Sequence, residues 1–527
     1  MSSDPARAYV AARAASISGD HSLAAERFAQ LAASSSDSAL RQKAIAEAIS
    51  AGDMDLALRL VRQVPQASMS IDSKLLLTAD ALKRGQSAEA LKILSKAGND
   101  ADLTFWAPLI EAWAAADRKD SAGALAILAR VPKSSAFFPF VDEENALILL
   151  ELGQSAQAEP YARRAIGKAG PREYRLRLAL AAGFAAARDS ARADMMLEGI
   201  SGDTTELRQA LRRSGLKSAA IDSANEAFSE QLIALALEMR RSQSASAAPV
   251  NIVQVARFAA PQNGSSAILL ANLLAEQERL PDALAALHSI ANDDPLKAEA
   301  LDSEVRILAR AKRYPEALQL AQAATNARGS TGSDFARLGD IYSAMDRNNE
   351  AAAAYGQALA RADHNDKEQM WPLLLLQASA LESADRWPEA KAALGSAIAI
   401  APDEPLILNF LGYAKLEHGE DLEAAEALIR KASELAPDDA SITDSLGWAL
   451  YKRGRLEEAI EMLQKAAIGD PAQAEIQEHL GDALYAAGRR FEARFAWRAA
   501  LATAEDEAVA RIKSKIDAGL SQATAAP

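Results

Sequence analysis

The sequence of 527 residues contains no cysteine, which excludes disulfide bonds and thiolate metal sites. Aromatic residues are also scarce: they make up 5% of the chain, although half of its residues are hydrophobic. Alanine and leucine supply most of the apolar side chains. Because alanine is the strongest helix former and lets helices approach closely, this composition favours a tightly packed helical protein.

Basic residues are outnumbered by acidic ones, with 58 Lys and Arg against 72 Asp and Glu. The formal net charge is −14 and the isoelectric point is near 5.1. A nucleic-acid-binding protein usually carries a basic patch and has a high isoelectric point, so we expect no nucleic-acid partner. No apolar run approaches the length of about 18 residues that identifies a transmembrane helix, so we expect no transmembrane segment.

The chain as given begins without a secretory signal. Its first five residues, Met1 to Pro5, contain no basic region, and no long apolar run follows them. We therefore expect a cytoplasmic protein if this start is authentic, and a periplasmic one if an N-terminal signal has been removed.

The motifs of common enzyme classes are missing. The sequence has neither the Gly-x-x-x-x-Gly-Lys-Ser/Thr loop that cradles phosphates nor a Gly-x-Ser-x-Gly nucleophile elbow. The histidines lie far apart along the chain, at His21, His288, His364, His418 and His479. None of them forms a His-x-x-x-His or His-Glu-x-x-His pair. We expect no enzyme activity and no bound metal, nucleotide or organic cofactor.

The sequence does contain an internal repeat of 34 residues. Leu446-Gly447 recurs as Leu480-Gly481, and Gly454 recurs as Gly488. A glycine at this place suits the left-handed conformation that ends a helix. The spacing predicts two helices per repeat, the second of which packs through a small residue, Ala459.

This alanine can be followed along most of the chain. It recurs at Ala24, Ala57, Ala90, Ala124, Ala158, Ala193, Ala283, Ala317, Ala351, Ala390, Ala425, Ala459 and Ala493. An irregular helical bundle has no reason to keep such a period. The pattern resembles the tetratricopeptide-repeat (TPR) signature. The resemblance implies an all-α TPR solenoid, a right-handed superhelix of stacked helix–turn–helix units.

The alanine series is interrupted once, between Ala193 and Ala283. We therefore predict an N-terminal array of about six units at residues 1–200 and a C-terminal array of about seven units at 264–520. A degenerate helical joint at 201–263 would separate them, and a disordered tail would follow at 521–527. The alternative for 201–263 is an insertion that does not interrupt the stacking.

In TPR proteins the first helix of each unit lines the concave face, where partners bind. Carried over to this sequence, the resemblance implies a partner-binding groove formed by Asn409, Tyr413, Asp444, Trp448, Tyr451, Glu478, Asp482 and Tyr485. We expect Tyr413 and Trp448 to anchor a protein or peptide, because aromatic anchors often carry binding energy. For Tyr451 and Tyr485, packing against the neighbouring unit is an equal alternative.

The last unit is basic and aromatic. Its second helix carries Arg490, Arg494 and Arg498 after Arg489. These side chains are expected to form a solvated capping face, since the final unit of a repeat array needs a polar outer surface.

The succession of motifs from Asn409 to Trp497 is similar to a bacterial envelope family of long TPR proteins. That family includes lipoprotein adaptors of carboxyl-terminal processing proteases, and the similarity covers roughly residues 370–500. It implies a scaffold or adaptor in envelope assembly or regulated proteolysis, with a protease or envelope complex as partner. The lipidated cysteine of those lipoproteins is absent here. Two alternatives are a substrate-recruiting subunit of a separate enzyme system and a self-assembling structural solenoid.

Overall fold

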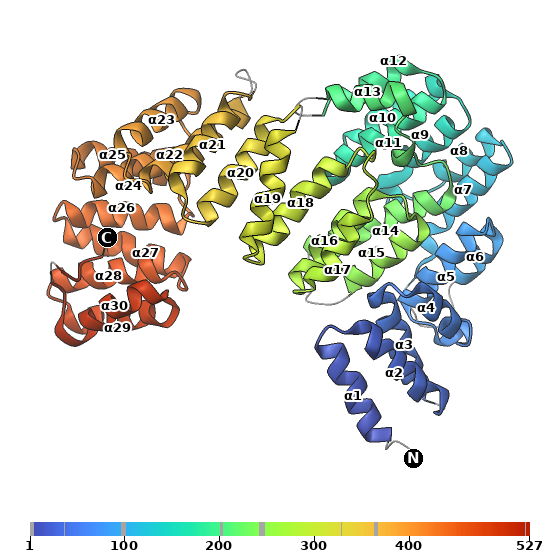
Figure 1. Cartoon of the computed structure of the whole chain (residues 1–527), viewed down its shortest axis with the longest axis horizontal. Coiled ribbons are helices and arrows are strands. Elements are labelled where there is room, and N and C mark those ends of the chain that lie inside the picture. Colours follow the sequence, from blue (N-terminus) through green and yellow to red (C-terminus); the bar gives the residue numbers. More distant parts are fainter. Residues whose placement is uncertain are drawn as a thin grey trace. The chain divides into compact units, whose positions relative to one another are not determined.

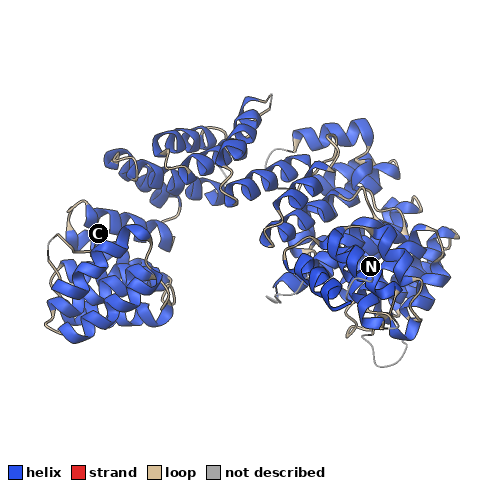
Figure 2. Cartoon of the chain, turned by 60° about the horizontal axis from the view of Figure 1, so that its bottom comes forward, coloured by secondary structure: helices blue, strands red, loops and turns tan. Residues whose placement is uncertain are grey.

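The computed structural model describes residues 5–35, 37–95, 102–200, 204–241, 248–327, 329–362, 367–521 and 523–526. Within these ranges every regular element is a helix and none is a strand (Figure 2). The all-α prediction is confirmed. No helix in these ranges is long and apolar enough to cross a membrane. His364 and residues 242–247 lie outside the described part of the chain.

The chain divides into two compact units, residues 1–320 and 321–527 (Figure 1). The division falls within α19 (Tyr314–Asn326). The structure thus differs from the predicted division at 201–263, because the helices of that segment belong to the first unit.

Unit 1 begins with six helix pairs: α1 (Pro5–Ile17), α2 (His21–Ala33), α3 (Ser38–Ala51), α4 (Met54–Val61), α5 (Ile71–Lys83), α6 (Ser87–Leu94), α7 (Ala107–Asp117), α8 (Ser121–Ala129), α9 (Val141–Glu151), α10 (Ser155–Ile166), α11 (Glu173–Ala186) and α12 (Ser190–Leu197). There follow α13 (Thr205–Ser214), α14 (Ala224–Arg241), α15 (Ala248–Ala259), α16 (Gly264–Glu276), α17 (Leu280–His288), α18 (Lys297–Arg310) and most of α19. Short 3-10 turns lie at η1 (Gln66–Ser68), η2 (Thr104–Trp106), η3 (Phe138–Phe140), η4 (Gly170–Arg172) and η5 (Lys217–Ala219).

Unit 2 continues the paired arrangement. Its helices are α20 (Gly332–Ala344), α21 (Asn348–Leu359), α22 (Lys367–Glu382), α23 (Trp387–Ile400), α24 (Pro405–Glu417), α25 (Leu422–Leu435), α26 (Ala440–Lys452), α27 (Leu456–Gly469), α28 (Ala474–Ala486), α29 (Arg490–Thr503) and α30 (Asp506–Ala518). Each pair, such as α26 and α27, packs against the next.

Small residues set the distance between the two helices of a pair. All thirteen alanines of the series are fully buried in the second helices. In the first helices α20, α24, α26 and α28 of unit 2 a glycine faces the same crossing. A Cβ atom added at Gly447 would lie 2.6 Å from Cγ of Leu463, which is itself fully buried. Close packing of α26 on α27 therefore requires glycine at position 447. At the turn between the helices, Gly454 has a φ of 76°, a left-handed value that favours glycine.

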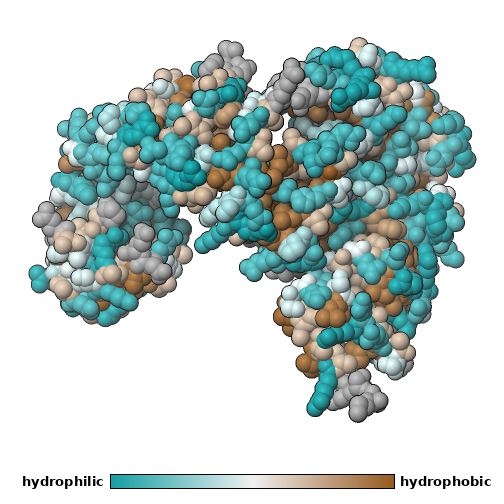
Figure 3. All heavy atoms as spheres, in the orientation of Figure 1, coloured by the Kyte–Doolittle hydropathy of each residue, from teal (hydrophilic) through white to brown (hydrophobic). Residues whose placement is uncertain are grey.

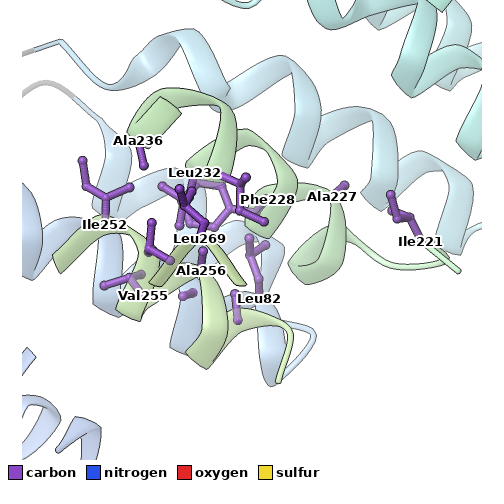
Figure 4. Packing of buried hydrophobic residues seen from close by; sticks show 14 of the residues in the cluster. Leu82, Ile221, Ala227, Phe228, Leu232, Ala236, Ile252, Val255, Ala256 and Leu269 are labelled. Atoms are coloured by element: carbon purple, nitrogen blue, oxygen red, sulfur yellow. The ribbon is translucent and has the colours of Figure 1, made fainter. Parts of the chain in front are cut away.

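Helices α14 and α15 pack against the first helices of the N-terminal pairs. Helix α15 contacts α3 and α5, and α14 contacts α5 and α7 (Figure 1). Phe228 and Leu232 of α14 lie near Leu82 of α5 and Ile252 of α15 in one apolar cluster (Figure 4). The segment predicted to be a joint is thus part of the core of unit 1. Its own apolar side chains are buried by the array that precedes it.

The end of the chain also differs from its prediction. The backbone N–H of Ala526 donates a hydrogen bond of 2.9 Å to Oδ2 of Asp482, and Ala526 is only 4% exposed. The residues described after 520 therefore include a segment that packs on α28, where a disordered tail was predicted. Ser521 and Thr524 are linked by side-chain and backbone hydrogen bonds.

Candidate partner-binding site

In unit 1 the face formed by the first helices is already occupied by the chain itself. Asn251 of α15 accepts a hydrogen bond from Ser50 of α3 at 2.5 Å and donates one to Asp72 of α5 at 2.8 Å. Further along this face, Arg175 of α11 is paired with Glu230 of α14 at 2.9 Å. Several polar groups of this face are thus paired with α14 and α15, although Oδ1 of the buried Asn145 of α9 has no partner in the described chain.

One carboxyl group in this interface, that of Glu144, has a raised pKa. Glu144 of α9 is fully buried, and Oε2 and Oε1 accept hydrogen bonds from Trp113 Nε1 and Gln231 Nε2 at 2.8 and 3.1 Å. Burial and the neighbouring charge of Glu143 raise the pKa of Glu144 to about 8. The hydrogen bonds oppose this rise without cancelling it. Glu144 is therefore a mostly neutral group at the centre of the N-terminal array at neutral pH.

In unit 2 the predicted groove residues come together on three neighbouring first helices, α24, α26 and α28. Trp448 of α26 lies between two other rings. It stacks on Tyr451 at 4.7 Å and on His479 of α28 at 4.1 Å, with interplanar angles of 14° and 13°. Lys452 Nζ lies 4.8 Å from the centre of the indole. Trp448 is fully buried by these neighbours.

Asp444 and His479 form a buried pair beside this stack. His479 Nδ1 lies 2.8 Å from Asp444 Oδ2, and the two residues are 0% and 5% exposed. Burial by itself would lower the pKa of His479. The attraction and hydrogen bond of Asp444 outweigh burial, so the pKa is raised above its usual value of 6.5. The site therefore favours an imidazolium with Nδ1–H donated to the carboxylate.

Four buried polar atoms of this region lack a hydrogen-bond partner within the described chain. They are Asn409 Oδ1, Asp444 Oδ1, Trp448 Nε1 and His479 Nε2. Unpaired buried polar groups are rare in proteins, because each costs about 1–3 kcal/mol. By contrast, Trp497 Nε1 donates to Asp482 at 2.8 Å. We call these four atoms, which lie on the neighbouring first helices α24, α26 and α28, the concave cluster.

Tyr413 reaches across this cluster. Its hydroxyl lies 3.4 Å from Glu475 Oε1, so a side chain of α24 contacts α28, on the far side of α26. Burial, followed by the charges of Glu475, Glu417 and Asp444, raises the pKa of Tyr413. Since the four unpaired atoms lie below the surface, a partner can reach them only when a covering side chain moves.

Two predicted groove residues, Glu478 and Asp482, form ion pairs with side chains of α30. Glu478 accepts hydrogen bonds from Arg511 at 2.9 Å and from Lys515 at 2.6 Å. Asp482 accepts from Lys515 at 2.8 Å, as well as from Trp497. Both carboxylates are almost fully buried. In this structure they hold the last helix in place and are not free to contact a partner.

The burial of Trp448 also corrects the expectation of an exposed aromatic anchor. An indole with no exposed surface cannot insert into a partner, and its truncation to alanine would leave a cavity in the fold. Tyr451 and Tyr485 are partly exposed. Tyr485 contacts the Trp497 ring, with 5.4 Å between ring centres, which supports its packing alternative. The role of the whole predicted set in partner binding stays a prediction.

The sequence reading missed His479, Arg511 and Lys515. His479 belongs to no metal or catalytic motif of the sequence, although it follows Asp444 by 35 residues, one more than the repeat length. That spacing places the two side chains on neighbouring first helices. Arg511 and Lys515 lie on α30, which has no repeat marker, so no periodic signal pointed to them. Within the described ranges, no cluster of three or more His, Asp or Glu side chains could hold a metal ion.

Comparisons with known proteins identify the repeat. A tetratricopeptide-repeat family model matches residues 268–332 and 375–440. A second tetratricopeptide-repeat model matches 335–365, and a TPR-repeat model matches 447–488. TPR repeats are therefore present in both units, and the chain folds as an all-α TPR solenoid. Among curated proteins none matches the sequence.

Several solved structures resemble the chain. The Cut9–Hcn1 complex of the APC/C covers 98% of this chain and 97% of its own, at 15% identity and a TM-score of 0.38. MamA from Desulfovibrio magneticus RS-1 covers 34% of this chain and 97% of its own, at 20% identity and a TM-score of 0.29. YrrB, described as a TPR protein with an unusual peptide-binding site, covers 37% and 98%, at 18% identity and a TM-score of 0.28.

Proposed function

We propose that this all-α TPR solenoid is a protein-binding scaffold whose partner segment docks on the concave cluster of unit 2. The observation that supports this proposal is the group of four buried polar atoms without partners on α24, α26 and α28. Because unpaired buried polar atoms lower the stability of the fold, packing within the solenoid does not explain why this group is present. A partner that satisfies these atoms would recover that free energy on binding.

The chemistry of the cluster suggests what it recognises. Trp448 Nε1–H is a donor, Asn409 Oδ1 and Asp444 Oδ1 are acceptors, and His479 Nε2 donates when the imidazole is protonated. A peptide backbone offers both kinds of group, a carbonyl that accepts and an N–H that donates. The cluster therefore suits an extended peptide segment, with Tyr413 at its rim as an apolar contact. The occupied face of unit 1 supports placing this site in unit 2.

The test compares a variant of the site with a matched control. The full chain is used to recover partners, and the purified partner is then titrated against wild type and variants by calorimetry. Trp448→Phe removes the unpaired donor and keeps an aromatic ring. We expect it to weaken binding about tenfold or more, which corresponds to ~1.4 kcal/mol. Trp387→Phe is the control, because the Trp387 indole donates to Glu420 at 2.8 Å on another part of unit 2.

Two results would overturn the proposal. One is an unchanged affinity in Trp448→Phe and in Asn409→Leu. The other is an equal loss of affinity in Trp387→Phe. Tyr485→Ala is expected to have a smaller effect than Trp448→Phe, because Tyr485 packs on Trp497.

The resemblance of residues 370–500 to bacterial envelope adaptors supports a narrower proposal. In it, the partner is a carboxyl-terminal processing protease or another component of an envelope complex. The identity of the protein recovered with the full chain tests it. A partner that binds at the concave cluster but belongs to neither class would leave the scaffold function standing and remove the envelope role.

A further inference from the structure

The outer side of α29 carries two exposed phenylalanines. Phe491 is 76% exposed and Phe495 is 54% exposed, and the two rings contact each other with 4.9 Å between their centres. Among the described residues the only other aromatic side chain in the exposed class is Tyr9, at 36%. In a chain so poor in aromatics, an exposed pair on one helical turn needs an explanation.

The repeat supplies an internal comparison. The positions 34 residues earlier, on α27, are occupied by Glu457 and Glu461, and both are exposed. The fold therefore accepts a charged residue at each of these places. The phenylalanines are not needed for packing within the unit, so their exposed surface is available for a contact outside it.

Three arginines run beside the phenylalanines. Arg490, Arg494 and Arg498 follow each other at intervals of four residues and so share one face of α29. All three are exposed, and none forms an ion pair within the described part of the chain. Arg489, one residue earlier, differs because it is paired with Glu492. The face made of these three arginines and two phenylalanines is here called the α29 face.

The α29 face is a basic island in an acidic unit. Residues 321–527 contain 21 Lys and Arg against 33 Asp and Glu, a net charge of −12. An extended anionic surface such as a lipid bilayer would be repelled by the unit as a whole. A short acidic segment would meet only the local charge, because screening limits electrostatic interactions to about 10 Å at moderate salt. Charge complementarity thus favours a peptide over a membrane.

We propose that the α29 face binds an acidic polypeptide segment that carries apolar side chains. Carboxylates of the segment pair with the arginines, whose planar guanidinium groups match carboxylate geometry. Its apolar side chains cover Phe491 and Phe495. This surface lies on a second helix of the repeat and shares no residue with the concave cluster. It would give the scaffold a second, independent docking point.

The experiment uses the full chain and a short fluorescent peptide in which Asp and Glu alternate with Leu and Phe. Binding is followed by anisotropy at low and high salt. We expect saturable binding that weakens as salt is raised. The double variant Phe491→Glu/Phe495→Glu installs the residues that the preceding unit carries, so it is expected to fold. It should weaken binding about tenfold or more.

Matched controls separate this surface from others. Arg494→Gln/Arg498→Gln should weaken binding and its salt dependence, whereas Arg489→Gln should leave both unchanged. Trp448→Phe should bind the acidic peptide like wild type, so that failure of the concave site and failure of the α29 face are told apart.

Several outcomes would overturn the proposal. These are no binding of the acidic peptide, equal binding by the Phe491→Glu/Phe495→Glu variant, or equal binding of a twin peptide with Lys in place of Asp and Glu. Cosedimentation with phosphatidylserine–phosphatidylcholine vesicles that depends on the arginines, without peptide binding, would assign the face to lipid. Self-association of the chain that the double variant abolishes, again without peptide binding, would assign it to a second copy.

Discussion

At the scale of single residues, the polar side chains buried in unit 2 divide into satisfied and unsatisfied groups. Asp482 receives hydrogen bonds from Trp497, Lys515 and the backbone of Ala526. Trp448, also fully buried, donates to no group in the described chain. This contrast separates residues whose hydrogen bonds stabilise the fold from residues whose unpaired polar groups could bind a partner.

The two tryptophans should respond differently to the same substitution. Trp448→Phe and Trp497→Phe both remove ring volume from a fully buried place. Only Trp497→Phe also removes a made hydrogen bond and leaves Asp482 with one partner fewer. We expect its free energy of unfolding to fall by about 1–3 kcal/mol more than that of Trp448→Phe. Urea unfolding followed by circular dichroism measures both, and equal losses would contradict the assignment.

Glu144 predicts a pH dependence for unit 1. Its pKa is raised from 4.5 to about 8 in the folded chain, mainly by burial. Between these values the folded chain keeps a proton that the unfolded chain has released. The contribution of Glu144 to stability is therefore full below about pH 4.5 and declines as pH rises towards 8, by up to ~1.4 kcal/mol per pH unit.

The variant Glu144→Gln isolates this effect, because an amide does not titrate in this range. Its free energy of unfolding should depend less on pH between about 5 and 8 than that of wild type, and it should be the more stable of the two near pH 8. Chemical denaturation at several pH values provides the measurement. Parallel curves for the two proteins would show that Glu144 is ionised in the folded state.

At the scale of helices, the repeat depends on small residues where the two helices of a pair cross. Gly447 of α26 faces the buried Leu463 of α27, and an added methyl group would overlap it. A methyl group added at Gly395 of α23 would meet no atom within 4 Å, and Gly395 lies inside a regular helix. Packing therefore excludes a larger side chain at position 447 but not at position 395, although both glycines lie inside helices.

Alanine substitution should separate them. Gly447→Ala is expected to overpack the crossing and destabilise the chain by about 1–3 kcal/mol. Gly395→Ala should be neutral or stabilise by up to about 1 kcal/mol, because alanine is the better helix former. Thermal unfolding of the two variants measures both changes in stability and tests this prediction. A similar destabilisation by both would mean that crossing distance is not what selects glycine at 447.

At the scale of the whole molecule, the two units use the same repeat in different ways. In unit 1 the first helices are covered by α14 and α15, so the array encloses a second layer of its own chain (Figure 4). In unit 2 the first helices α24, α26 and α28 carry four of the unpaired buried atoms of the described chain, and α30 binds Glu478 and Asp482 of α28. The viewed surface is largely hydrophilic, with hydrophobic residues gathered near the α1 end of unit 1, where Val10 and Ile17 are exposed (Figure 3).

The covering layer predicts where a core variant acts. Phe228 of α14 is fully buried, contacts the ring of Trp106, and lies on a helix that packs against α5, α7 and α15. Phe228→Asp places an unpaired charge there, so we expect faster amide exchange in α3, α5 and α7. The helices of unit 2 should exchange as in wild type. Hydrogen exchange with mass spectrometry gives the measurement, and faster exchange throughout α20–α28 would show that the two units unfold together.

The sequence by itself determined the class of fold. The 34-residue period marks thirteen alanines, and every one of them is fully buried. Local chemistry is enough for this, since helix propensity, crossing residues and turn glycines act within one repeat or between neighbours. The same reasoning pointed to the first helices α24, α26 and α28, from which Asn409, Asp444 and Trp448 join the unpaired cluster.

Only the tertiary structure decided which surfaces are filled. The place of α14 and α15 depends on contacts such as Ser50 with Asn251, which lie 201 residues apart and follow no period. The same holds for Lys515, which neutralises Glu478 and Asp482 from a helix outside the repeat. A periodic pattern says which side of a helix faces inward. What then covers that side depends on long-range packing between segments that carry no repeat signal, and so Trp448 is buried although it lies on the predicted binding face.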